Sequence, residues 1–343
     1  MNDLSTPLRG RVAASLTAPV GLVALVVTHN RTAQLRVTLA RLLAEQVDAI
    51  VIVDNASTDG TGELLSAIAE PRLHVITLPR NMGGAGGFEV GLRAVVARFD
   101  PAWCVLMDDD ARPYAGSLAS FQSQSTELEM AGYEAIAASV FYPDGRICEM
   151  NRPSRNPFWH LAEFLRTLFG QGRSGFHLRD SDYASPVPLP IDAASFVGLF
   201  LSRKGLARAG YPDGDLFLYA DDVMYTLRLT KLGGRIGFLP ELRFEHDCST
   251  FDPIGQGLHW PIWKVYYNHR NALLAYRMVA GPVLFWPVLI LVYVKWRRRG
   301  HKSGEDRKVY RALLNLAVTD FLTGRPNRNI AEVRARALSR FQG

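Results

Sequence analysis

The chain has 343 residues, of which 48% are hydrophobic and 21% charged, and its net charge is +6. This composition excludes a disordered chain and suffices for one large domain with an appendage. The cysteines Cys104, Cys148 and Cys248 lie far apart and lack the spacing of a zinc site, so they predict reduced thiols in a cytosolic setting. Residues 1–20 lack the apolar stretch of a signal peptide, and we expect them to form a flexible tail.

From residue 21 the chain alternates between continuous apolar runs and helical periodicity. Continuous apolar runs are typical of strands buried on both faces of a parallel sheet, and apolar residues every three to four positions indicate helices. The expected strands are 21–28, 49–53, 73–78 and 103–107. The expected helices are 31–46, a short one through Leu64, Leu65 and Ile68, and 88–99, with a glycine-rich loop at 81–87. This alternation predicts an α/β fold with a mostly parallel, doubly wound sheet flanked by helices.

After about residue 135 the pattern becomes less regular. The expected strands are 136–141, 191–201, 236–239 and 242–246. A helix is expected over 223–232, where Gly233 and Gly234 would end it. Residues 151–190 are rich in arginine, proline, glycine and aromatic residues, and we expect them to form an irregular insertion.

A helix expected over 263–277 is followed by the uncharged apolar run 278–294, which is short for a membrane span and which Pro282 and Pro287 would kink. Aromatic residues typical of a membrane interface accompany this run: Trp286, Tyr293 and Trp296. Basic residues follow it: Lys295, Arg297, Arg298, Arg299, Lys302, Arg307, Lys308 and Arg311. A buried core helix is the alternative, but these flanks favour shallow insertion or a short hairpin at a membrane. Basic residues that accompany an apolar run also argue against nucleic-acid binding.

A second basic group near the C-terminus is expected to be a solvated face. It consists of Arg325, Arg328, Arg334, Arg336 and Arg340.

Polar clusters follow the ends of the expected strands in the first half of the chain. They are Thr28-His29-Asn30, Asp54, the glycine-rich loop and Asp108-Asp109-Asp110. Ligands of doubly wound sheets bind beyond the carboxyl ends of the strands, so we expect these clusters to line one site. The glycine-rich loop suits close backbone approach to a sugar or diphosphate. A dehydrogenase fingerprint would follow the first strand rather than the third.

The acidic triplet at 108–110 is the strongest local feature. Three consecutive carboxylates repel one another in a dry site, so they need solvent or a cation. A solvated loop is one alternative, but the position at a strand end favours Mg²⁺ or Mn²⁺ bound together with diphosphate oxygens. His246 is a candidate third ligand, or else a structural histidine. Asp221 and Asp222 begin an expected helix and are either a general base or charges stabilised by the helix dipole.

Taken together, these motifs resemble glycosyltransferase family 2, whose members have the GT-A fold. The resemblance runs from about Val23 to Asp247. Residues 26–31 and 53–60 are similar to the family's first two nucleotide loops, and Asn81–Phe88 and 108–110 are similar to motifs of bacterial galactofuranosyl- and rhamnosyltransferases. The resemblance implies a GT-A domain over 21–250, followed by a helical, membrane-associating region over 251–343.

The resemblance also implies roles for individual residues. The nucleotide-sugar would be held by Thr28, Asn30, Arg31, Asp54, Asn81, Gly84, Asp108 and Asp109. The metal ion would be held by Asp108, Asp110 and His246. Asp222 would be the base, with Asp221 as the alternative. The family's Trp-Asp-Asp motif has Ala220 in place of tryptophan here, so Phe217 or Tyr219 would supply the aromatic surface for the acceptor.

We therefore expect an inverting, metal-dependent glycosyltransferase at the cytoplasmic face of the plasma membrane. It would move galactofuranose or rhamnose from a UDP- or dTDP-linked donor to a lipid-linked or cell-surface glycan. A sugar nucleotidyltransferase is one alternative, but it would carry a glycine-rich basic loop where this chain has residues 28–31. A non-catalytic homologue that keeps the nucleotide-sugar site is another. The sequence leaves the oligomeric state open.

Overall fold

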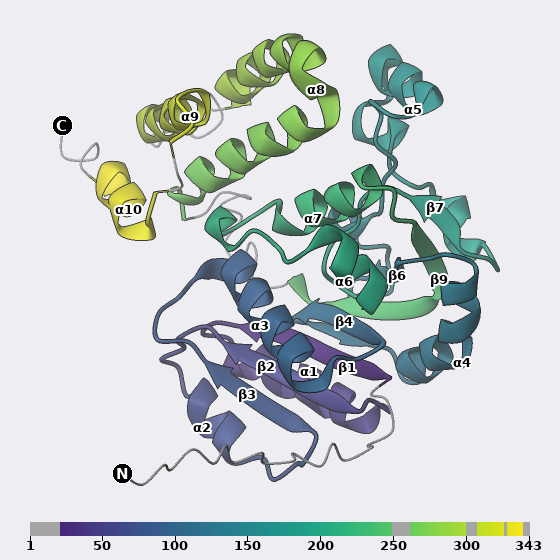
Figure 1. Ribbon diagram of the computed structural model, residues 1–343. Helices are drawn as coiled ribbons and strands as arrows, with labels where there is room; N and C mark the ends of the chain where they lie inside the picture. Colours follow the sequence, from purple (N-terminus) through teal and green to yellow (C-terminus); the bar gives the residue numbers. More distant parts are fainter. Residues whose placement is uncertain (1–20, 249–260, 300–306, 326–327, 339–343) are drawn as a thin grey trace, which may run out of the picture.

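The structure is a computed structural model that describes residues 21–248, 261–299, 307–325 and 328–338 (Figure 1). The tail expected over 1–20 lies outside the described residues, as do Lys302, Arg340 and the boundary expected at residue 250. Strands of the described chain form one nine-stranded sheet in the order β3-β2-β1-β4-β8-β6-β9-β5, with β7 beside β9. Their bounds are β1 Leu22–Thr28, β2 Ala49–Asp54, β3 Leu73–Thr77, β4 Trp103–Asp108, β5 Ala111–Pro113, β6 Ala135–Phe141, β7 Leu189–Ile191, β8 Leu199–Ser202 and β9 Ile236–His246.

The first four strands pair in parallel, as the alternation of strands and helices predicted. The second half of the sheet is mixed: β8 runs antiparallel to both β4 and β6, and β9 runs parallel to β6. The strand expected over 191–201 is confined to its two ends, β7 and β8. The two strands expected at 236–239 and 242–246 are one strand, β9, because a register shift opposite Ser139 accommodates Pro240 within it. Proline cannot donate to the ladder and is tolerated at such a bulge.

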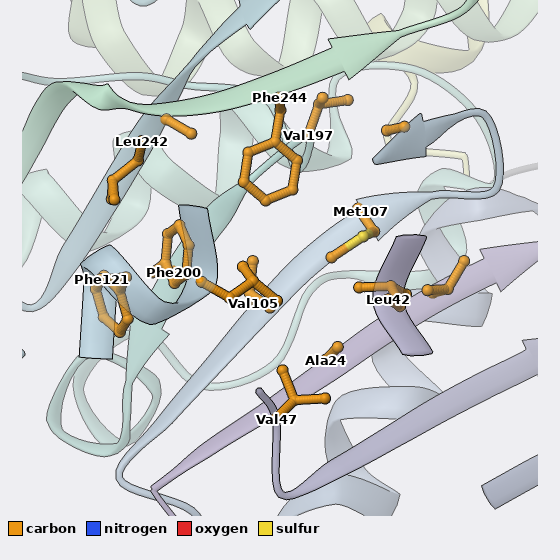
Figure 2. Packing of buried hydrophobic residues seen from close by; sticks show 14 of the residues in the cluster. Ala24, Leu42, Val47, Val105, Met107, Phe121, Val197, Phe200, Leu242 and Phe244 are labelled. Carbon is orange, nitrogen blue, oxygen red and sulfur yellow. The ribbon is translucent and has the colours of Figure 1, made fainter. Parts of the chain in front are cut away.

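Helices cover both faces of the sheet (Figure 1). Their bounds are α1 Thr32–Ala44, α2 Thr61–Ser66, α3 Gly83–Phe99, α4 Ser117–Met130, α5 Leu161–Arg166, α6 Arg203–Ala209, α7 Asp221–Lys231, α8 Lys264–Arg299, α9 Arg307–Leu322 and α10 Ile330–Leu338. Alternate residues of β1 face opposite cores, because successive side chains of a strand point to opposite faces. Ala24 packs in the core with α1 and α4, and Leu25 packs in the core with α3 and α7. Figure 2 shows the first core, in which Phe121 of α4 stacks on Phe200 of β8 with ring centroids 4.0 Å apart.

The prediction of a glycine-rich loop at 81–87 is wrong for most of that segment, because its glycines form the first turns of α3, which begins at Gly83. Close packing on the sheet explains two glycines of this helix, Gly87 and Gly91. A Cβ on Gly87 would lie 2.4 Å from Cγ1 of Val27, and one on Gly91 would lie 2.5 Å from Cδ1 of Leu25. Glycine therefore lets α3 approach β1 more closely than a side chain would allow.

The expected apolar run 278–294 lies within α8, which bends at Gly281. Gly281 has a φ of 71° and precedes Pro282, so the helical ladder is interrupted there. The second half of α8 folds back on the first, since the Trp296 ring lies 4.5 Å from that of His269. Helix α9 packs against α8, and a third apolar core lies among α8, α9 and α10. By length and composition α8 could span a membrane, but its bent form is a hairpin.

Candidate functional site

The carboxyl ends of β1, β2, β3 and β4 meet at one edge of the sheet. Thr28 pairs with Asp54, Asp54 with Thr77, and Val27 with Asp108, so the polar residues that follow these strands lie level with one another. Hydrogen bonds join the loops. Oδ1 of Asn30 accepts from the Thr58 N–H at 2.7 Å, which connects the loops after β1 and β2.

The loop after β2 is joined in turn to the start of α3. The Asn55 side chain accepts from the Met82 N–H and donates to the Gly83 carbonyl, both at 2.7 Å. Asn81 accepts from the Gly83 N–H at 2.7 Å, and a Cβ on Gly84 would meet nothing within 4 Å. The side chain of Asp54 is buried and accepts from the Ser57 N–H at 3.0 Å. These residues of the predicted nucleotide-sugar set therefore lie along one edge.

Asp108, Asp110 and His246 come together although 136 positions separate the last two. One ligand atom from each lies within 4.8 Å of those of the other two, and Nε2 of His246 is 3.2 Å from Oδ1 of Asp110. The pairing of β5 with β9 produces this arrangement, because it sets Ala111 opposite His246. Two carboxylates and an imidazole form a ligand set suited to Mn²⁺.

Arg31 and Thr28 reach the same cluster from the loop after β1. Arg31 forms ion pairs with Asp110 and, at 3.3 Å, with Asp109. The Thr28 hydroxyl donates to Asp109 at 2.8 Å, and both residues are buried. Asp109 therefore holds the ends of β1 and β4 together, while Asp108 and Asp110 flank His246.

Burial and neighbouring charges shift the pKa values of this cluster. Burial and the charge of Asp110 raise the pKa of Asp108 to about 7, and burial raises the pKa of Asp109 to about 6 although Arg31 opposes it. Burial also acts to raise the pKa of Asp110, but the hydrogen bond and charge of His246 and the charge of Arg31 lower it overall. Burial acts against a charged His246, yet its hydrogen bond to Asp110 and other anionic neighbours raise its pKa to about 10. The cluster thus favours positive charge at its centre.

Asn151 fixes the orientation of the His246 ring. Its Oδ1 lies 2.7 Å from Nδ1 of His246, and its Nδ2 donates to the Ser195 hydroxyl at 2.9 Å. Because Nδ2 is engaged with Ser195, Oδ1 faces the imidazole and accepts the proton on Nδ1, which leaves Nε2 toward Asp110. The sequence contained no local signal for this role, since Asn151 begins a segment that was expected to be irregular.

The acidic pair Asp221 and Asp222 begins α7, as expected. Oδ1 of Asp222 accepts from the Val223 N–H at 2.7 Å. Burial raises the pKa of Asp222 to about 6 against the effect of backbone N–H donors. Burial and the charges of Asp222 and Asp108 raise the pKa of Asp221 well above its ordinary value. Since Asp108 contributes to the shift of Asp221, that residue of the pair lies within electrostatic reach of the first cluster.

The residues before α7 have a constrained backbone. Phe217, Tyr219 and Ala220 have φ values of 63°, 69° and 63°, which are uncommon for residues other than glycine. The side-chain amide of Asn271 in α8 donates to the carbonyls of Leu216, Leu218 and Tyr219. Helix α8 thereby holds the loop that presents the acidic pair. Strained backbone of this kind is concentrated at functional sites.

The two aromatic residues predicted to bind the acceptor lie in this loop. The ring centroid of Phe217 lies 5.0 Å from that of Tyr267 in α8, so part of its surface is covered by the helix. The Tyr219 hydroxyl is buried and has no hydrogen-bond partner among the described residues, and burial raises its pKa to about 12. The loop also contacts α3, since the Ala85 N–H donates to the Phe217 carbonyl at 3.3 Å.

The chain is similar to known proteins in both sequence and structure. Residues 23–175 match the family model described as Glycosyl transferase family 2. The chain is 31% identical to galactofuranosyltransferase GlfT1 of Mycolicibacterium smegmatis, over 72% of this chain and 80% of the relative. It is 30% identical to GlfT1 of Mycobacterium tuberculosis, over 67% of this chain and 72% of the relative.

Two solved structures share the fold at 13% sequence identity. S. aureus TarS 1–349 in complex with UDP-GlcNAc has a TM-score of 0.54, with 93% of this chain and 88% of that chain covered. GalNAc-T7 with UDP, GalNAc and Mn²⁺ has a TM-score of 0.51, with 91% and 60% covered.

Proposed function

Because this chain belongs to glycosyltransferase family 2 and is a glycosyltransferase, we propose that it transfers galactofuranose from a UDP-linked donor to a glycan with inversion at the anomeric carbon. The observation that carries this proposal is the convergence of Asp108, Asp110 and His246 at the edge of the sheet where nucleotide ligands of such folds bind. The names of the relatives support galactofuranose over rhamnose.

Asp108, Asp110 and His246 fit a divalent metal ion such as Mn²⁺. Their ligand atoms are close together, and the hydrogen bond to Asn151 directs Nε2 of His246 toward the carboxylates. When bound, such an ion supplies positive charge that stabilises the departing nucleoside diphosphate. GalNAc-T7, which shares the fold, was solved with UDP and Mn²⁺.

The loops after β1 and β2 would hold the nucleotide. Asp54 and Asn30 stand at the ends of adjacent strands, and their hydrogen bonds to Ser57 and Thr58 hold both loops in place. Arg31 is ion-paired with Asp109 and Asp110, and its positive charge would attract the diphosphate oxygens of the donor. Preformed loops of this kind reduce the entropy lost on binding.

Asp222 would accept the proton of the acceptor hydroxyl as that oxygen attacks the anomeric carbon. The pKa of Asp222, raised to about 6, keeps the carboxylate largely ionised at neutral pH while making it a stronger base than an ordinary aspartate. The charges of Asp222 and Asp108 add to burial in raising the pKa of Asp221, whereas burial alone raises that of Asp222. We therefore assign the base to Asp222. A direct displacement needs one such base and no nucleophile from the protein, so the anomeric configuration inverts.

The second half of α8 would lie on the cytoplasmic face of a membrane, where a lipid-linked acceptor is found. Its exposed apolar residues form a patch: Val283, Leu284, Trp286, Ile290, Leu291 and Val294. The α5 segment and the turn after it expose Leu161, Leu165, Leu168 and Phe169. Helix α5 and the bend of α8 lie at the same end of the molecule in Figure 1, opposite α2 and β3. Exposed patches of this kind, with basic residues beside them, are typical of interfacial helices.

A donor screen tests the reaction. The purified chain with Mn²⁺ should release UDP from UDP-galactofuranose in the presence of a galactan-type acceptor, and should use dTDP-rhamnose at least about tenfold less well. Use of neither donor would reject the proposed sugar. Pyrophosphate release from UTP and a sugar 1-phosphate would instead identify a nucleotidyltransferase.

Flotation with anionic lipid vesicles tests the membrane contact. The chain should float with the vesicles, and the Ile290→Ser, Leu291→Ser double variant should float at least about fivefold less. Val37→Ser is the matched control, because Val37 is an exposed apolar residue on α1. Equal flotation of the double variant and the wild type would reject the contact.

A further inference from the structure

A sulfur-rich cluster lies beside the His246 ring. The sequence spacing of the cysteines predicted no metal site, but the fold brings Cys148 and Cys248 together. One ligand atom from each of Cys148, Cys248 and His246 lies within 4.8 Å of those of the other two. Sγ of Cys148 is 4.0 Å from Nδ1 of His246, and Sδ of Met150 is 3.3 Å from Sγ of Cys248.

The cluster differs chemically from the carboxylate cluster on the other ring nitrogen. Thiolate and thioether ligands select soft cations such as Zn²⁺ and Cu⁺, whereas carboxylates suit Mg²⁺ and Mn²⁺. With Zn–S near 2.3 Å and Zn–N near 2.1 Å, tetrahedral ligand atoms lie roughly 3.5–3.8 Å apart, so small side-chain movements would close the site. Cys148 is buried, but Cys248 is half-buried and Met150 is 39% exposed, which opens the cluster to solvent.

We propose that Cys148, Cys248 and Nδ1 of His246 form a second metal site that binds a soft cation such as Zn²⁺. This site and the first site compete for the imidazole of His246. The thioether of Met150 stands beside Cys248 as a further soft ligand. Both thiols lose their protons to solvent when the cation binds, since the thiolate is the ligand.

Occupation of this site should remove His246 from the carboxylate cluster. A neutral imidazole has one lone pair for a metal and carries its proton on the other nitrogen. Asn151 keeps that proton on Nδ1. A soft cation on Nδ1 would move the proton to Nε2, displace Asn151 and leave Nε2 as a donor to Asp110. This consequence for transfer rests on the proposed function, whereas cation binding itself does not.

Cobalt absorption tests the site without any assay of transfer. The full-length protein, treated with chelator and kept reduced, is titrated with Co²⁺ as a spectroscopic substitute for Zn²⁺. One equivalent should produce near-ultraviolet thiolate-to-cobalt charge-transfer absorption, which Zn²⁺ should displace. Cys248→Ser and Cys148→Ser should lose this absorption, while Cys104→Ala should keep it because Cys104 lies in a separate core. Circular dichroism verifies that each variant is folded. Absent absorption in the wild type, or undiminished absorption in folded Cys248→Ser, would overturn the proposal.

Zinc inhibition tests the shared imidazole. With Mn²⁺ in excess, Zn²⁺ should inhibit transfer by the wild type, and Cys248→Ser should need at least about tenfold more Zn²⁺ for the same inhibition. Equal inhibition of the wild type and Cys248→Ser would show that Zn²⁺ acts elsewhere. It would overturn the inference that a cation at the sulfur-rich cluster removes His246 from the carboxylate cluster. Cobalt absorption in a protein that transfers no sugar would reject the proposed function and leave the soft-metal site standing.

Discussion

The acidic residues that follow β4 and those that begin α7 are similar carboxylates in different surroundings. Asp110 faces the cations Arg31 and His246, which lower its pKa despite burial. Asp222 faces backbone N–H donors, and burial raises its pKa to about 6. A carboxylate that remains ionised, such as Asp110, suits a metal ligand, and one with a raised pKa suits a proton acceptor. The pKa of Asp108 is raised to about 7, so this second ligand would need the charge of a bound cation to stay ionised. The comparison teaches that surroundings, rather than residue type, divide the two roles.

The largest effect is expected for Asp110→Asn. This change removes a metal ligand and a partner of Arg31, so transfer should fall by about 10⁴-fold and Mn²⁺-dependent UDP binding should be lost. Isothermal titration with UDP and Mn²⁺ and a transfer assay measure the two effects. Asp247→Asn is the matched control, because this carboxylate lies one residue beyond His246 but pairs with Arg112. Normal Mn²⁺-dependent UDP binding by Asp110→Asn would show that Asp110 is not a ligand of the metal ion.

Asp222→Asn should separate catalysis from binding. Loss of the base should lower kcat by about 10²–10⁴-fold, while UDP and Mn²⁺ binding stay within about twofold of the wild type. The same titration and transfer assay apply. Near-normal kcat would defeat the base assignment. If Asp221→Asn instead gave the larger loss, the base would be Asp221.

Asn151→Ala should weaken Mn²⁺ affinity by about 10–100-fold, because the His246 ring loses the acceptor that orients it. The KM for Mn²⁺ should rise, and kcat at saturating Mn²⁺ should change much less. Asn151→Asp keeps an oxygen acceptor and should restore most of the affinity. A loss of kcat that excess Mn²⁺ does not recover would indicate a different role for Asn151.

The pH dependence of transfer tests whether the pKa of the base is raised. The base must be ionised, so kcat/KM at saturating Mn²⁺ should fall about tenfold per pH unit below the raised pKa of Asp222, about 6, and level off above it. If kcat/KM began to fall only near pH 4, the pKa of an ordinary aspartate, this result would contradict the assignment of Asp222 as the base.

The smallest effect concerns the stability of the metal-free protein. The folded pKa of Asp108, about 7, lies above its ordinary value, so ionisation between about pH 4 and pH 7 costs folded-state stability. Asp108→Asn avoids this cost. In chelator, its Tm relative to the wild type should therefore rise by a few degrees from pH 5 to pH 8, as measured by calorimetry. An unchanged difference between the two pH values would show that burial does not penalise this charge.

The two acidic groups also show what the sequence could predict. The end of β4 was predictable because a continuous apolar run and its terminal carboxylates are both local features. The partnership of Asp110 with His246 depends on the pairing of β5 with β9, so sequence resemblance suggested it but periodicity could not. Asn151 and the Cys148–Cys248 cluster also arise from long-range packing and have no local pattern.

The start of α3 shows a local pattern overruled by packing. Its glycines are typical of a loop, yet from Gly83 onward they form helix, and Val27 and Leu25 of β1 leave no room for side chains at Gly87 and Gly91. The antiparallel direction of β8 likewise depends on where the chain re-enters the sheet after residues 151–190. In contrast, Pro282 and Pro287 predicted kinks from local geometry alone, and α8 is interrupted at Gly281, directly before Pro282, but keeps helical backbone at Pro287.

Anomalous scattering from Mn²⁺ in crystals grown with UDP shows whether Asp110 and His246 bind the metal ion. We expect one manganese peak within coordination distance of Asp110 and Nε2 of His246, with UDP oxygens completing its ligands and Asp222 outside them. A peak bound by Asp221 and Asp222 instead, or UDP bound away from the ends of β1 and β4, would contradict it.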